Sequence, residues 1–356
     1  MLTLEERWAI GDRAPLPKVA NSLQSGCAVC GEEKNIRTCS ACYVVSYCGP
    51  DHQRAHRRTH RFVCDAVKNE KLALQSAEAH AQANTTNTRG FHSGANLLPL
   101  MQLPDPAMLQ LFQAYHQSSL TVFLRRINTV KSVQAQKGHF QRCNALLFAN
   151  SLDFHCAALE ATARLGQDQE LYDSIKALCI FQMIDGTFHH ENVLESIDFM
   201  IQPTDSFWYH RILDLLVLMT FFKVKLLLDL MRLDVARTAL GSKFPREVLD
   251  MVLLNIPESR TVTTNRGIMN STDLIAEITT IAAQVDLLLA EVNDRNPRFW
   301  NKLALHNPNN SLVERPTQQE LSNHSLAQAK DLFLCHVYCW FETPGAIALL
   351  RRKRGF

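Results

Sequence analysis

The chain of 356 residues is 46% hydrophobic and 20% charged, and its formal net charge at pH 7 is +2. These values are those of an average globular protein, so they argue against global disorder and against a fibrous architecture. The small net charge also excludes a surface that is basic throughout, so any contact with nucleic acid would have to be local.

The N-terminal leader, residues 1–26, contains three acidic residues within its first 18 positions and no apolar run of the kind found in secretory signals. We therefore expect an intracellular protein, located in the cytoplasm, the nucleus or both. Cysteine usage agrees with this, because six of the eleven cysteines fall within residues 27–64. In a reducing compartment such a dense cluster is more typical of metal ligation than of disulfides.

Residues 27–64 contain four pairs of cysteine and histidine, and two or three residues separate the members of each pair. The pairs are Cys27 and Cys30, Cys39 and Cys42, Cys48 and His52, and His60 and Cys64. Such spacing lets a short turn or one helical turn direct two side chains at the same ion, and zinc accepts both sulfur and imidazole nitrogen. Eight ligands therefore suit two tetrahedral zinc ions. His56 lies on the same helical face, and we interpret it as an unliganded, solvated side chain because the eight positions are filled.

Local sequence also predicts the framework of this segment. The β-branched and aromatic residues in "NIRTC" and "YVVSYC" favour two short strands, and Pro50 favours the first turn of a helix that begins near Asp51.

The order of the ligands, with Tyr47 directly before the fifth of them, resembles the MYND-type zinc finger. The resemblance implies a small cross-braced finger, made of a short β-hairpin and a helix, that holds two structural Zn²⁺ ions. It assigns Cys27, Cys30, Cys48 and His52 to the first ion, and Cys39, Cys42, His60 and Cys64 to the second. His52 stands where the family usually has cysteine, so both sets would be Cys3His.

Four protein ligands for each ion leave no open position for water, so the sites are predicted to be structural and not catalytic. A finger of about 40 residues buries too little apolar surface to fold alone. We therefore expect zinc to supply its folding free energy, on the order of 10 kcal/mol or more.

The resemblance further implies a protein-interaction module that binds short, proline-containing peptides beside an edge strand. Gln53 occupies the position of a glutamine in the family's peptide groove, whereas Arg57 replaces its tryptophan, and an arginine favours an acidic ligand. Arg54, Arg58 and Arg61 complete the candidate partner-binding residues. The basic helix 53–61 also supports an alternative, a nucleic-acid-binding regulator.

The rest of the chain is predicted to be mainly all-α. We expect a helical extension at 65–83, a polar linker at 84–106, an all-α domain at 107–345 and a basic tail at 346–356. The predicted helices cover about 107–128, 140–165, 168–184, 190–201, 207–240, 245–254, 274–292 and 327–341. The basic tail is a candidate nuclear-import patch.

The most apolar stretch, residues 212–231, contains Asp214, Lys223, Lys225 and Asp229, and a membrane span tolerates almost no such residues. It predicts a buried core helix, and we expect no membrane partner.

No motif of a phosphate loop, a zinc protease or a nucleophile elbow occurs, so we predict a protein that is not an enzyme. The group His189, His190, Glu191 and Glu195 is interpreted as an exposed first turn of a helix, and Cys335 and Cys339 as buried thiols. MYND fingers also occur in SET-type lysine methyltransferases, and Asn323, His324 and Ser325 match part of their motif.

The sequence as a whole predicts a non-enzymatic adaptor or regulator, which could act in the regulation of transcription. The second alternative is a divergent SET-type methyltransferase.

Overall fold

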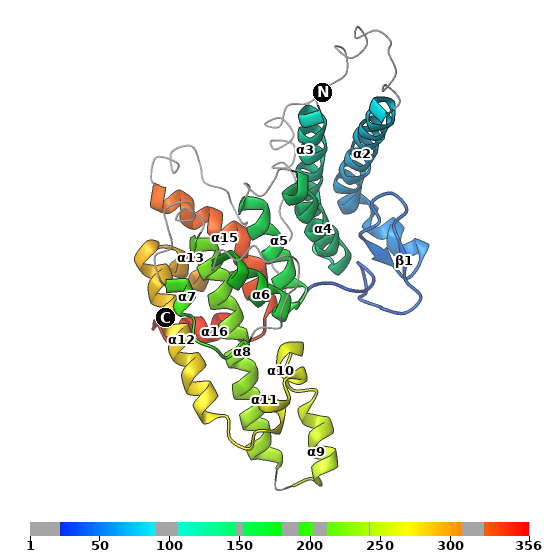
Figure 1. Ribbon diagram of the computed structural model, residues 1–356. Coiled ribbons are helices and arrows are strands. Elements are labelled where there is room, and N and C mark those ends of the chain that lie inside the picture. Colours follow the sequence, from blue (N-terminus) through cyan, green and yellow to red (C-terminus); the bar gives the residue numbers. More distant parts are fainter. Residues whose placement is uncertain are drawn as a thin grey trace. The chain divides into compact units, whose positions relative to one another are not determined.

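The structure is a computed structural model that describes residues 22–89, 106–146, 152–179, 192–201, 212–241, 243–307 and 324–355 (Figure 1). Contacts divide the chain into two compact units, of which the first is mainly Leu23–Ala158 and the second mainly Leu159–Phe356. In the described residues, strands are confined to one small hairpin and the remainder is mostly helical. The predicted fold class, a β-hairpin and helix followed by a mainly helical region, is confirmed.

The hairpin consists of β1 (Arg37–Thr38) and β2 (Ser46–Tyr47), which pair antiparallel so that Thr38 lies opposite Ser46. The second edge of β2 is covered by the chain that enters the finger, because the backbone N–H of Ala28 donates to the carbonyl of Ser46 (2.9 Å). Cys27 forms a parallel bridge with the same residue. The free edge of the hairpin is therefore that of β1, as far as the described residues show.

The helix α2 (Pro50–Arg89) begins at the predicted proline and is much longer than predicted. It continues through the expected extension into the first part of the predicted linker, because no glycine or proline interrupts the sequence before Gly90. The other linker residues up to 105 lie outside the described ranges.

The helices α3 (Pro106–Leu124) and α4 (Val130–Leu146) pack in the same unit as the finger (Figure 1). One apolar core joins Val44 and Val45 of the hairpin region and Val67 of α2 to Leu120 of α3 and Ile127 of the loop after it. This division differs from the predicted one, in which the helices after residue 107 formed a single domain. Its physical reason is that the finger's own apolar residues need a cover, which α3 and the loop after it provide.

The second unit is built of helices. These are the end of α5 (Leu152–Arg164), α6 (Asp168–Cys179), α7 (Asp198–Ile201), α8 (Ile212–Leu240), α9 (Arg246–Leu253), α10 (Arg260–Thr264), α11 (Arg266–Asn270), α12 (Ile275–Arg295), α13 (Phe299–Leu305), α15 (His324–Glu342) and α16 (Ala346–Arg354). The predicted basic tail belongs to this fold as α16: Leu349 and Leu350 are buried, and Arg351 donates to the carbonyl of Ala304 (2.8 Å). That segment is a docked helix and not a free tail.

The predicted core helix is α8, which is buried on every side along most of its length. The four charged residues within its most apolar stretch, residues 212–231, each contact another element. His336 of α15 lies 3.1 Å from Asp214, Lys223 donates to the carbonyl of Val193 (2.7 Å), Lys225 pairs with Asp168 (2.8 Å), and Asp229 accepts from the backbone N–H of Ser259 (2.8 Å). The charges therefore position α8 inside the protein.

No single helix in the described ranges is long and apolar enough to cross a membrane. Taken together, the helix Ser325–Glu342 and α16 are long and apolar enough for a membrane span. The two helices are, however, bent by 114° relative to each other.

We predict that Lys225→Met destabilises the protein by about 3 kcal/mol, because it leaves the carboxylate of Asp168 buried without its cation. The free energy of unfolding should be measured by chemical denaturation. The variant Lys225→Met with Asp168→Asn should lose less than the sum of the single changes, and Arg352→Met, at an exposed position of α16, is the matched control. A loss below 1 kcal/mol for Lys225→Met would contradict this role.

Candidate metal centre

The loops of the finger bring cysteines together in two tight turns. Cys27 and Cys30 flank a turn in which the N–H of Gly31 donates to the carbonyl of Cys27 (2.9 Å), and Gly31 has a positive φ of 75°. Gly26 is required beside this turn, because a Cβ there would lie 2.4 Å from the carbonyl oxygen of Gly31. Cys39 and Cys42 flank the corresponding turn between β1 and β2.

The loops and the start of α2 thus supply six of the eight ligands. The other two, His60 and Cys64, lie one turn apart further along that helix. The first set comprises Cys27, Cys30, Cys48 and His52, and the second comprises Cys39, Cys42, His60 and Cys64; within each set the ligand atoms all lie within 4.8 Å of one another. The structure therefore brings the eight predicted residues together in the two groups that were expected.

The distances between ligand atoms are those around a tetrahedral zinc ion. Zn–S bonds of about 2.3 Å and Zn–N bonds of about 2.0–2.1 Å place two sulfurs about 3.8 Å apart, and a sulfur and a nitrogen about 3.5 Å apart. In the first set, the sulfurs of Cys30 and Cys48 are 3.7 Å apart, and Cys27 Sγ lies 3.5 Å from His52 Nδ1. A shorter edge, 3.0 Å, joins Cys48 Sγ to the same nitrogen.

The second set shows the same geometry. Cys39 Sγ lies 3.7 Å from Cys64 Sγ, and Cys42 Sγ lies 3.5 Å from His60 Nε2. Both donor sets fit zinc in ligand type, number and spacing, and each offers three sulfurs and one imidazole nitrogen.

The electrostatics of the sulfurs also require a cation. Burial raises the pKa of the Cys27 thiol, but backbone N–H groups at Cys30 and Val29 lower it more, to about 6. Burial and the nearby sulfurs of Cys42 and Cys39 raise the pKa of Cys64 far above its usual value. Three thiolates in one set therefore repel one another unless a metal ion compensates their charge. Zinc supplies that charge and in return makes the fold dependent on metal.

The surroundings of His60 keep its imidazole neutral, as a metal ligand must be. Burial, and secondarily the neighbouring His56, lower its pKa to about 4, so its imidazole keeps a lone pair for metal at neutral pH. Four buried residues form the second set, whereas Cys30 of the first set is exposed. The second site is consequently the better protected of the two.

Residues far along the chain hold the finger's loops in place. Lys71 of α2 donates to the carbonyl of Cys42 (2.6 Å), and Thr129, directly before α4, donates to the carbonyl of Val44 (2.6 Å). Lys131 of α4 donates to the hydroxyls of Thr38 (2.6 Å) and Ser46 (3.0 Å). No local pattern marks these residues, so the sequence could not identify them.

The interpretation of His56 as a solvated side chain is wrong. His56 lies outside both ligand sets, as expected, but it is half-buried and its Nδ1 lies 3.0 Å from the hydroxyl of Tyr47. Its ring also stacks on that of His60 at a centroid distance of 5.4 Å.

The predicted partner-binding residues Gln53, Arg54, Arg57, Arg58 and Arg61 are all exposed on α2. At about 100° per residue, Arg54, Arg58 and Arg61 lie roughly 100° to 160° around the helix from the buried His60, and Arg57 lies roughly 60° from it. Arg54 pairs with Asp51, and Arg61 with Asp65 at 3.6 Å, so two of the four positive charges are partly compensated.

The other candidate groups give no second centre among the described residues. His189, His190, Glu191 and Asn323 lie outside those residues. Glu195 accepts hydrogen bonds from Tyr172 (2.6 Å) and Lys176 (2.7 Å), which is a structural role. Cys339 is buried, as expected, and donates to the carbonyl of His336 (3.0 Å), whereas Cys335 is only half-buried; neither belongs to a metal group.

Comparison with known proteins agrees with this geometry. Residues 27–64 match the family model of the MYND finger. No solved structure matches the chain. The family match and the two ligand sets together show a MYND finger with two structural zinc sites, which is a zinc-dependent protein-interaction module and not a catalytic one.

We predict that His52→Ala lowers the zinc content of the purified chain from two ions to one, because three cysteines remain in the first set while the second is intact. Elemental analysis measures the content. His52→Cys is the matched control and should keep two ions, since it restores four ligands. Unchanged zinc in His52→Ala would show that the first set is assigned wrongly.

Proposed function

We propose that the chain is a non-enzymatic adaptor or regulator whose finger binds a short, extended peptide of a partner protein. The observation that carries this proposal is the free edge of β1 on a hairpin held by two closed metal sites. A peptide added to such an edge gains main-chain hydrogen bonds, while side-chain pockets beside it select its sequence. Because zinc holds the hairpin, binding depends on zinc.

The side chains on α2 favour an acidic peptide, and a proline in that peptide is compatible with this mode of binding. Gln53 and Arg57 are exposed and lie one helical turn apart. Where a tryptophan would offer an apolar wall, the guanidinium of Arg57 offers two parallel donors that suit a carboxylate. The partner is therefore proposed to place an acidic residue against this turn.

The cellular setting is a further part of the proposal. Thiolate ligands stay reduced inside the cell, so we place the protein in the cytoplasm, the nucleus or both. Regulation of transcription is one process in which such an adaptor would act. The basic residues of α16 support nuclear import less than the sequence suggested, because Lys353 pairs with Asp286 (2.6 Å) and Arg354 donates to Asn293 (2.7 Å).

A nucleic-acid-binding regulator remains the second candidate, and one observation favours it. Arg57 and Arg58 are exposed, and neither has an acidic partner within the described ranges. The ion pairs of Arg54 and Arg61 reduce the positive field of the same helix, which favours a peptide over a polyanion. For the methyltransferase alternative, the structure offers no supporting observation: strands in the described residues are two residues long, and a SET fold is rich in strands.

The proposal predicts that the full chain binds an acidic proline-containing peptide more tightly than its amide counterpart, and that a zinc chelator abolishes binding. We expect a difference of about threefold to tenfold, the range for a charge-assisted hydrogen bond at an exposed site. Fluorescence anisotropy with labelled peptides of the PxLxP type, carrying Glu or Gln at the variable positions, measures it.

Arg57→Trp should shift the preference from the acidic to the neutral peptide, while Arg58→Trp, on the neighbouring exposed position, should leave it unchanged. The proposal fails if neither peptide binds the chain with two zinc ions, or if a DNA duplex binds more tightly and its affinity falls steeply with salt.

A further inference from the structure

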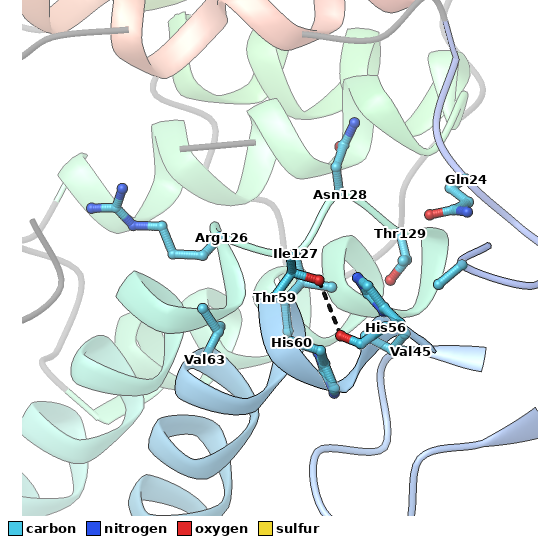
Figure 2. A pocket seen from close by; sticks show the side chains of 11 residues that line it. Gln24, Val45, His56, Thr59, His60, Val63, Arg126, Ile127, Asn128 and Thr129 are labelled. Carbon is cyan, nitrogen blue, oxygen red and sulfur yellow. Dashed lines mark hydrogen bonds between the residues drawn. The ribbon is translucent and has the colours of Figure 1, made fainter. Parts of the chain in front are cut away.

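A cleft beside the second zinc set is formed by three parts of the first unit (Figure 2). His56, Thr59, His60 and Val63 come from α2, residues 126–129 come from the connection between α3 and α4, and Gln24, Ala28 and Val45 come from the finger. Its volume is about 220 Å³. That is below the range of roughly 300–1,000 Å³ typical of small-molecule pockets, so it suits one amino-acid side chain better than a cofactor.

One wall of the cleft carries a hydrogen-bond donor, the imidazole of His60, whose tautomer is determined by zinc binding. His60 is 9% exposed, and its Nε2 belongs to the second ligand set. An imidazole that binds zinc through Nε2 carries its hydrogen on Nδ1, and such hydrogens almost always go to a carboxylate, a carbonyl or a water molecule. Within the described residues, no group accepts the hydrogen of His60 Nδ1.

The neighbouring imidazole adds a second donor. The hydroxyl of the buried Tyr47 has no other acceptor among the described residues, so it donates to Nδ1 of His56. The remaining hydrogen of His56 is then on Nε2. Because the two rings are stacked, both donors belong to one polar wall of the cleft.

The charges of the lining favour an anion. Arg126 is the one cation among the eleven lining residues, and none of the eleven is acidic. The other lining groups are the amides of Gln24 and Asn128, the hydroxyls of Thr59 and Thr129, and the apolar side chains Ala28, Val45, Val63 and Ile127. A small apolar cleft with imidazole donors and no acidic group suits the methylene groups and carboxylate of an acidic side chain. The guanidinium of Arg126 points away from the two imidazoles (Figure 2), so it adds a positive charge near the cleft and not a donor within it.

We propose that this cleft binds a glutamate or aspartate side chain of a partner protein, whose carboxylate accepts the hydrogen of His60 Nδ1. Gln53 and Arg57 are not among the residues that line the cleft, so the cleft is a site additional to the edge-strand site. It rests on the proposed function in taking its occupant from a protein partner. A carboxylate on Nδ1 makes the imidazole a stronger zinc ligand, so occupancy of the cleft and retention of the second zinc are linked.

The test uses the zinc-loaded full chain with isotope-labelled histidine, titrated with capped glutamate (N-acetylglutamate α-methylamide) and, separately, with capped glutamine. We expect saturable shifts of the His60 and His56 nitrogen resonances with glutamate, and binding at least fivefold weaker with glutamine. Capped glutamate should also slow one phase of zinc release to a chelator. Equal shifts with both probes, or no saturable shift, would overturn the proposal.

Three variants locate the site. Arg126→Gln should weaken glutamate binding only slightly, through the loss of a nearby positive charge, whereas Arg57→Gln, at the turn assigned to the edge-strand site, should leave the shifts of His60 and His56 unchanged. His60→Cys keeps four zinc ligands but lacks the imidazole donor, so it should retain two zinc ions and bind glutamate severalfold more weakly. Weakening by Arg57→Gln alone would place the probe on the arginine face and refute the cleft. If capped glutamate binds here while the peptides of the proposed function do not bind, the edge-strand proposal fails and the cleft stands.

Discussion

Ligation of zinc by α2 is the constraint on which the first unit depends. Each ligand set takes two cysteines from a loop turn and its other two ligands from the first four turns of α2 or just before them, so each ion ties the helix to a different loop. The direction of α2 is therefore fixed at its first four turns. Its remaining length forms a platform for α3 and α4, and Thr129 and Lys131 return from that platform to bond the hairpin. Metal, hairpin and helices stabilise one another as one core.

In the second unit, no metal cluster among the described residues fixes the positions of the helices. There, α8 is surrounded by other helices, and its buried charges specify which neighbour meets which turn. Lys225 selects α6 through Asp168, Asp214 selects α15 through His336, and Asp229 selects the loop before α10. Burying a charge is costly unless it is paired, so an arrangement that breaks one of these contacts is disfavoured. The pairs thus contribute specificity more than net stability.

The parts of this structure that could be predicted from the sequence are those set by local spacing. The ligand pairs, the start of α2 at Pro50 and the buried nature of residues 212–231 each follow from residues within one or two turns of each other. What could not be predicted depends on contacts between distant residues. The packing of α3 on the finger, the bond from Lys71 to the carbonyl of Cys42 and the docking of α16 have no signature in their own segments. The interpretation of His56 failed because its partner Tyr47 lies in β2, nine residues earlier, and no helical spacing relates the two.

The geometry of α2 gives the finger two surfaces with different relations to the metal. The exposed arginines lie outside both ligand sets, so a peptide bound there would depend on zinc only through the hairpin that the ions hold. The cleft lies on the ligand side and shares His60 with the second zinc set. A carboxylate that binds His60 Nδ1 must, by thermodynamic linkage, tighten zinc by the same factor by which zinc tightens the carboxylate. The two proposed surfaces of α2 would therefore both depend on zinc, the first through the fold of the hairpin and the second through a shared ligand, His60.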